Sequence, residues 1–162
     1  MQALPHLDAA YNLARWLSRS PADAEDIVQE AMLRAYRAFD GFKGSSMKPW
    51  LLAIVRNCWR NWGSDTKRHA HMPLPEQEDA ALIADDLNPE QAAVRASERR
   101  KLNEALKLLP NEFREVLILR EVEDMSYREI ADITETPIGT VMSRLARARA
   151  MLRETWMAEE RP

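Results

Sequence analysis

The sequence predicts an all-helical protein, made of two small helical domains joined by a flexible acidic linker. Only 4 glycines occur among 162 residues, and β-branched residues rarely alternate with polar ones as they do in strands. Apolar residues instead recur at helical spacing in several stretches that begin with good helix caps. Residues 69–89 lack that spacing and are rich in Ala, Pro, Asp and Glu. We therefore expect domains at residues 1–68 and 93–162, with residues 69–92 as the linker.

The N-terminal domain is expected to contain three or four helices. Residues 7–17 have the apolar spacing of a short amphipathic helix. Ser20 can cap a second helix, with Pro21 at its first position and acidic residues in its first turns, where they complement the helix dipole. That helix runs to about Phe39, and a third helix spans residues 47–63 after a loop at 40–46.

One face of the second helix is acidic and polar. Asp26, Gln29 and Glu30 stand at i, i+3 and i+4, which places them side by side on a helix surface. Spacing alone favours a solvated face here over a binding site.

The loop and the third helix together have the chemistry of a surface for single-stranded nucleic acid. Phe42 lies between Gly41 and Gly44, and a ring in such a loop either stacks on a base or fills a small apolar gap. The third helix directs Leu51, Ile54, Val55 and Cys58 inward, and its other faces carry Trp50, Arg56, Asn57, Trp59, Arg60, Asn61 and Trp62. Aromatic rings suit unstacked bases and guanidinium groups suit phosphates, although a structural role for the tryptophans fits as well.

The C-terminal domain is expected to contain four helices. Residues 89–109 form the first, with Val94, Leu102, Leu106 and Leu109 inward, and Asn111 caps the next, at 112–121. Two short helical patterns then flank a break at 135–137. Ser126 and Glu129 form a capping box for the first of them, and Thr136 with Pro137 begins the second.

The last two helices have the pattern of a helix-turn-helix over residues 126–147. Val141, Leu145, Ala148 and Leu152 recur at helical spacing and should face the core. The opposite side of the second helix carries Thr140, Ser143, Arg144 and Arg147. The second helix of a helix-turn-helix enters the major groove N-terminal end first, and hydroxyls and arginines suit phosphates and guanine edges. An ordinary helical hairpin with a solvated arginine face is the alternative.

Composition argues against several other classes. The net charge is −3, and residues 69–96 carry six Asp and Glu against one Arg, so the acidic excess lies in the linker. One cysteine, Cys58, excludes an intrachain disulfide framework and fits the cytoplasm. We expect no membrane insertion. His69 and His71 lack further ligands at plausible spacing, so we predict no metal, no cofactor and no catalytic residue.

Three stretches resemble the bacterial extracytoplasmic-function (ECF) sigma factors of the sigma-70 family. They read DAEDIVQEAMLRAYRAFDGFKG, WLLAIVRN and LPNEFREVLILREVEDMSYREIADITETPIGTVMSRLARAR. The resemblance covers nearly the whole chain, in order, with an acidic linker between. It implies a region 2 domain that binds the β′ clamp helices of core RNA polymerase and melts the −10 element. It also implies a region 4 domain that recognises the −35 element and contacts the β flap.

The resemblance assigns roles to residues of this sequence. It implies that Asp26, Gln29 and Glu30 meet the clamp helices. It implies that Phe42, with Lys43 and Ser45, captures a flipped base, and that Asn57, beside Arg56 and Arg60, contacts the −10 strand. In the last helix, Ser143, Arg144 and Arg147 match positions that touch −35 DNA. Met142 and Ala146 depart from the pattern, because relatives often carry arginine or lysine, and an aromatic residue or histidine, at those places.

The resemblance further implies that the free protein is held compact or captured by an anti-sigma factor. We therefore predict a promoter-specificity subunit, not an enzyme. A stand-alone helix-turn-helix regulator that binds duplex DNA as a dimer is the alternative, and it leaves the pattern at 23–62 unexplained. A metal-dependent nuclease using His69 and His71 is a third reading, for which the sequence offers no convergent carboxylate set.

Overall fold

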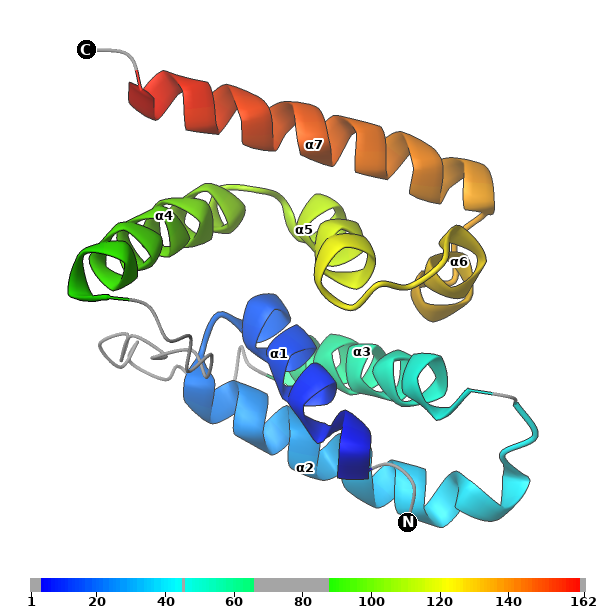
Figure 1. The fold of residues 1–162 in the computed structure, drawn as a ribbon. Coiled ribbons are helices and arrows are strands. Elements are labelled where there is room, and N and C mark those ends of the chain that lie inside the picture. The colour runs from blue at the N-terminus through cyan, green and yellow to red at the C-terminus, as the bar shows by residue number, and fades with distance from the viewer. Residues whose placement is uncertain (1–3, 45, 66–87, 161–162) are drawn as a thin grey trace.

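The computed structural model describes residues 4–44, 46–65 and 88–160. Every regular element in these ranges is a helix, which confirms the all-helical class. Figure 1 shows two helical layers, with α1, α2 and α3 in one layer and α4 to α7 in the other. Ser45, His69 and His71, and most of the predicted linker, lie outside the described residues.

The N-terminal layer is a three-helix bundle. A short 3-10 turn, Leu4–His6, leads into α1 (Leu7–Ser18), which packs against α2 (Pro21–Ala38) and α3 (Met47–Asp65). Ser20 caps α2 as predicted, because its hydroxyl accepts a hydrogen bond from the Asp23 backbone N–H at 3.3 Å. The core of this bundle is built mainly from small and branched apolar side chains: Ala10, Leu13, Leu17, Ala24, Ile27, Ala31, Leu51, Leu52 and Val55.

The C-terminal layer is organised around its last helix. It consists of α4 (Pro89–Lys107), α5 (Asn111–Leu117), a π-helical turn η3 (Ile118–Val122), α6 (Tyr127–Thr134) and α7 (Ile138–Glu160). α7 packs on α4, α5 and α6, and it spans the top of the molecule in Figure 1. Its inward stripe of Val141, Leu145 and Ala148 is buried, as its spacing predicts.

α4 begins where the sequence predicts a helix, at Pro89, but two residues of its predicted core face are exposed. Asn88 caps this helix with its side-chain oxygen 2.8 Å from the Gln91 backbone nitrogen, so residues 89–92 of the predicted linker are helical. Val94 and Leu102, expected to face inward, are exposed. The physical reason is that α4 meets the rest of the domain mainly near its C-terminal end, where Leu106 is buried.

Two predicted caps also differ from the structure. Asn111 is the first residue of α5, and its side-chain oxygen accepts from the Arg114 guanidinium at 3.0 Å. α7 begins at Ile138, one residue after Pro137, and the Thr136 hydroxyl lies 2.8 Å from the Thr134 hydroxyl. In both turns the expected capping side chain contacts a side chain two or three residues away instead of a backbone N–H of the following helix.

The two layers pack directly on one another. α1 lies against α5 and η3, and α3 lies against α6, so buried residues of both layers form one continuous cluster. Among the described residues, no helix is long and apolar enough to cross a membrane. The contacts between the layers determine which predicted site residues remain accessible.

Candidate nucleic-acid and polymerase interfaces

The helix-turn-helix has the local structure predicted for it. The Ser126 hydroxyl accepts from the Glu129 backbone N–H at 3.1 Å, and the Glu129 carboxylate accepts from the Ser126 N–H at 2.9 Å, which completes the capping box. Glu135 ends α6 with a left-handed backbone at φ 54°, and this residue turns the chain into α7. The two helices are therefore held at a fixed geometry by caps and by their shared core.

The predicted −35 residues differ in their exposure to solvent. Ser143 and Arg147 are exposed, and the Ser143 hydroxyl donates to the Thr140 carbonyl at 3.0 Å. Thr140 is half-buried. Arg144 is also half-buried and forms an ion pair at 3.7 Å with Glu112 of α5. The outer face of α7 is thus open to DNA, while Arg144 is held against its own domain.

The acidic face of α2 is accessible. Asp26 and Gln29 are exposed, and Glu30 accepts from Arg34 at 2.9 Å, one turn later. That hydrogen bond raises the pKa of Arg34 above its ordinary value. Sequence reasoning missed Leu33, an exposed apolar side chain at the i+7 position from Asp26. Asp26, Gln29 and Leu33 are therefore accessible together on one face of α2.

The loop aromatic lies on the protein itself. The Phe42 ring is half-buried and packs against Trp50, with the two centroids 4.8 Å apart. A Cβ atom at Gly44 would come within 2.9 Å of the Phe42 ring, so this close approach favours glycine at that position. Lys43 is exposed. Phe42 must leave Trp50 if it is to hold a base.

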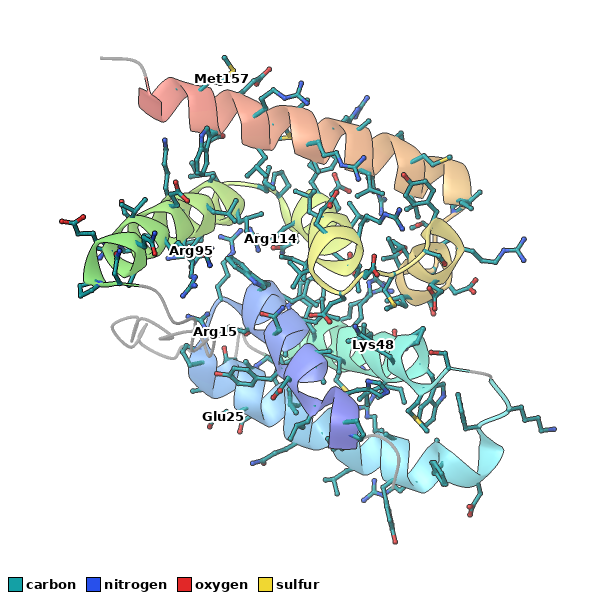
Figure 2. All side chains as sticks on the ribbon, viewed as in Figure 1. Arg15, Glu25, Lys48, Arg95, Arg114 and Met157 are labelled. Atoms are coloured by element: carbon teal, nitrogen blue, oxygen red, sulfur yellow. The ribbon has the colours of Figure 1, made fainter. Side chains whose placement is uncertain are left out.

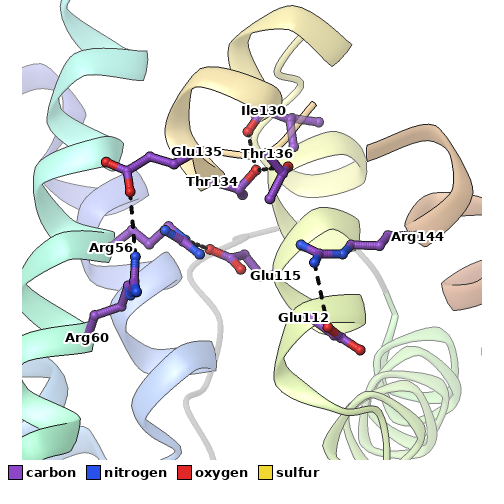
Figure 3. Close-up of polar contacts among 9 residues, drawn as sticks. All are labelled: Arg56, Arg60, Glu112, Glu115, Ile130, Thr134, Glu135, Thr136 and Arg144. Carbon is purple, nitrogen blue, oxygen red and sulfur yellow. Dashed lines mark hydrogen bonds and ion pairs between the residues drawn. The ribbon is translucent and has the colours of Figure 1, made fainter. Parts of the chain in front are cut away.

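The predicted −10 residues of α3 do not lie on one open surface. Asn57 is exposed, as expected. Arg56, expected on the outside, is buried in an ion pair with Glu115 of α5, and the two side chains are only 10% and 4% exposed. Arg60 is more open and lies 3.5 Å from Glu135 at the end of α6. Two arginines that the resemblance assigns to DNA are therefore bound to carboxylates of the C-terminal layer (Figure 3).

Burial sets the electrostatics of this contact. Loss of water raises the pKa of the Glu115 carboxyl above its ordinary value, and the attraction of Arg56 offsets part of that rise. A cleft of about 710 Å³ opens beside the pair, and Arg60, Arg144 and Glu112 also line it. Each of these arginines has a glutamate partner, so the cleft is balanced in charge.

Further polar contacts join the layers on the side of α1. Glu123, which is buried, accepts from Asn12 at 3.0 Å and pairs with Lys48 at 3.3 Å. Arg114 is fully buried and donates to the Leu109 and Leu106 carbonyls, at 2.5 and 2.9 Å, and to the Trp16 carbonyl at 3.2 Å. Burial lowers the pKa of Arg114 to about 10, so it stays charged at neutral pH. Figure 2 shows Arg114 between the layers and Lys48 on α3.

The comparisons with known proteins bear on both layers. Sigma-70 region 2 matches residues 4–69, and Sigma-70 region 4 matches residues 99–152. The ECF RNA polymerase sigma-E factor of Haemophilus influenzae is 32% identical over 86% of this chain and 77% of its own length. Its Escherichia coli K12 counterpart is 35% identical over 78% of this chain and 70% of its own length. This chain belongs to the ECF sigma factors.

Other relatives set the extent of the likeness. This sigma factor is 36% identical to the ECF RNA polymerase sigma factor SigE of Mycolicibacterium smegmatis. The match covers 92% of the present chain but only 58% of the length of SigE. A solved complex of the sigma factor RpoE with the anti-sigma factor NepR from Bartonella quintana gives a TM-score of 0.74 at 30% identity. The match covers 95% of this chain and 93% of that one. CnrH, solved with the cytosolic domain of CnrY, shares the fold at a TM-score of 0.67, with 24% identity over 97% of this chain and 86% of that one.

The sigma factor therefore brings region 2 and region 4 together through residues that sequence reasoning did not single out. Glu115, Glu123 and Arg114 each stand in an ordinary amphipathic helix or turn, and no local pattern marks them. All three are buried charges. Such charges require partners from another part of the chain.

Proposed function

We propose that this chain binds core RNA polymerase through α2 and directs it to promoters, with α7 on the −35 element and α3 with the 39–44 loop on the −10 strand. The observation that carries the proposal is the placement of two accessible surfaces on different domains. The α2 face with Asp26 and Gln29 is open on region 2, and the α7 face with Ser143 and Arg147 is open on region 4. A subunit that links polymerase to duplex DNA needs both surfaces.

The closed arrangement is proposed to be the resting form. Arg56 cannot hold a −10 strand while it is buried against Glu115, and Arg60, which is exposed, is paired with Glu135. The domains must separate before the promoter is melted, and ligands that bind only the separated form favour separation by their differential affinity. Polymerase supplies that affinity when its β′ clamp helices bind region 2 and its β flap binds region 4. Aromatic and amide groups then offset part of the cost of unstacking bases.

Control by an anti-sigma factor is proposed on the likeness to the Bartonella quintana sigma factor, which was solved with one. A partner that binds the closed form stabilises it by mass action and keeps the −10 residues covered. The chain is proposed to act in the cytoplasm, beside polymerase, as a specificity subunit and not as an enzyme. A stand-alone dimeric regulator would leave the open α2 face and the Arg56–Glu115 contact without a role.

Run-off transcription tests the proposal. Core polymerase is incubated with a library of promoters, with and without the purified chain, and the transcript starts are mapped. We expect new starts that depend on the chain and share paired −35 and −10 elements. If the chain neither copurifies with core polymerase nor changes any start site, the proposal fails, even if the chain binds duplex DNA.

A further inference from the structure

The outer face of α7 carries an apolar stripe next to its polar residues. Ile138 is 47% exposed and Met142 is 52% exposed, and Ala146, one turn further, is also exposed. Successive members are four residues apart, so they line one side of the helix. Ser143 and Arg147 follow Met142 and Ala146 by one residue and form a polar row beside the stripe.

The charge around this stripe fits DNA. Residues 138–153 contain four arginines and no acidic residue. Arg144 pairs with Glu112 at 3.7 Å and Arg149 with Glu121 at 2.6 Å, whereas Arg147 is exposed beside the stripe. The N-terminal part of the second helix of a helix-turn-helix enters the major groove, and the exposed Arg147 gives this face of α7 a positive charge that suits DNA.

The major groove offers one apolar group. Thymine alone presents a C5-methyl group there, and apolar side chains contact it, whereas guanine, adenine and cytosine present hydrogen-bonding edges. Arginine at these positions would favour guanine instead. Four residues of helix rise about 6 Å, close to two base steps of about 3.4 Å each, so Met142 and Ala146 are spaced to reach bases two steps apart.

We propose that Met142 and Ala146, with Ile138, select thymine in the −35 element through its methyl group, at positions about two base steps apart. This inference rests on the proposed function. It assigns base selection to the two positions where the chain departs from the basic or aromatic residues expected from the resemblance. Ser143 and Arg147 are left to hold phosphates or neighbouring bases.

Deoxyuridine substitution tests the inference, because deoxyuridine lacks only the methyl group. Promoters initiated by the chain with core polymerase are first selected from a library randomised at −35. Each −35 thymine is then replaced singly by deoxyuridine, and promoter affinity is measured in the complete complex. We expect replacement of a contacted thymine to weaken binding about fourfold, as loss of one buried methyl-sized group implies.

A pair of variants assigns the effect to residues. Met142→Gln should remove the preference for thymine over deoxyuridine at the position that Met142 contacts. Met157→Gln is the matched control, because Met157 is also 52% exposed on the same helix but lies near its C-terminal end, as Figure 2 shows. That variant should keep the preference.

The outcomes separate this inference from the function on which it rests. If deoxyuridine changes neither promoter affinity nor initiation at any −35 position, the methyl contact is wrong and the proposed sigma function is unaffected. The same holds if Met142→Gln keeps the preference and instead loses binding to a protein partner. Failure to initiate from any library promoter overturns both.

Discussion

The ion pair between Arg56 and Glu115 should control how far the two domains separate. Both side chains are at least nine-tenths buried. Arg56→Met keeps most of the side-chain length but leaves the Glu115 carboxylate without its cation. Removing one partner of a buried pair costs ~3–5 kcal/mol, because a buried charge is left uncompensated. In the separated form Glu115 is hydrated, so this cost falls on the closed form alone.

The expected change is large enough to observe in solution. A cost of ~3 kcal/mol shifts the ratio of closed to open molecules by at least about a hundredfold. A compact chain of this length has a radius of gyration of about 15 Å, and separated domains give a clearly larger value. Small-angle scattering, or energy transfer between labels on α2 and α7, measures the change near pH 7.5.

The pH dependence has a definite sign. Burial raises the pKa of Glu115, and without Arg56 the largest opposing influence is lost, leaving only the weaker attraction of Arg144 and Arg60. The closed form of Arg56→Met then binds a proton more tightly than the open form, so lowering the pH through the raised pKa should close the variant again. Arg56→Met combined with Glu115→Gln carries no buried charge at this contact and should stay closed at neutral pH.

Arg60→Met is the matched control, one turn away on α3. The Arg60 and Glu135 side chains are 55% and 63% exposed, and such pairs contribute about 0–1 kcal/mol. This variant should remain closed. Equal radii of gyration for Arg56→Met and Arg60→Met at neutral pH, or no recovery in the double variant, would refute the reasoning.

Three other residues give simpler tests. Asp26→Ala should reduce recovery of core polymerase in a pull-down with helicity unchanged, while Glu25→Ala, at an exposed neighbour, should not; equal recovery removes Asp26 from the docking surface. Arg147→Ala should weaken −35-dependent transcription by ~1–3 kcal/mol if it holds a base, and unchanged output would exclude that contact. Cys58 is buried and its pKa is raised by that burial, so alkylation of the folded chain should be slow at pH 7.5 and fast in denaturant. Rapid labelling of the native protein would contradict this.

The sequence by itself determined the helices and three of their caps. Ser20, Ser126 with Glu129, and Asn88 act through atoms within three residues, and the stripe of Val141 and Leu145 follows from helical period alone. Interactions of such short range are fully encoded in a local pattern. For the same reason helical spacing predicted the exposure of Asp26 and Gln29 on α2 and of Ser143 and Arg147 on α7, but not the half-burial of Thr140 and Arg144.

Only the tertiary structure decided what the charged residues do. Helical spacing places Arg56 and Arg60 beside Asn57, on faces expected to meet solvent. In the structure Arg56 is buried in an ion pair with Glu115, and Arg60 forms an exposed ion pair with Glu135. Val94 has the spacing of a core residue, yet nothing in the described part of the chain covers it. Burial depends on which distant segment packs against a helix face. Helical spacing identifies the face but not the segment that covers it.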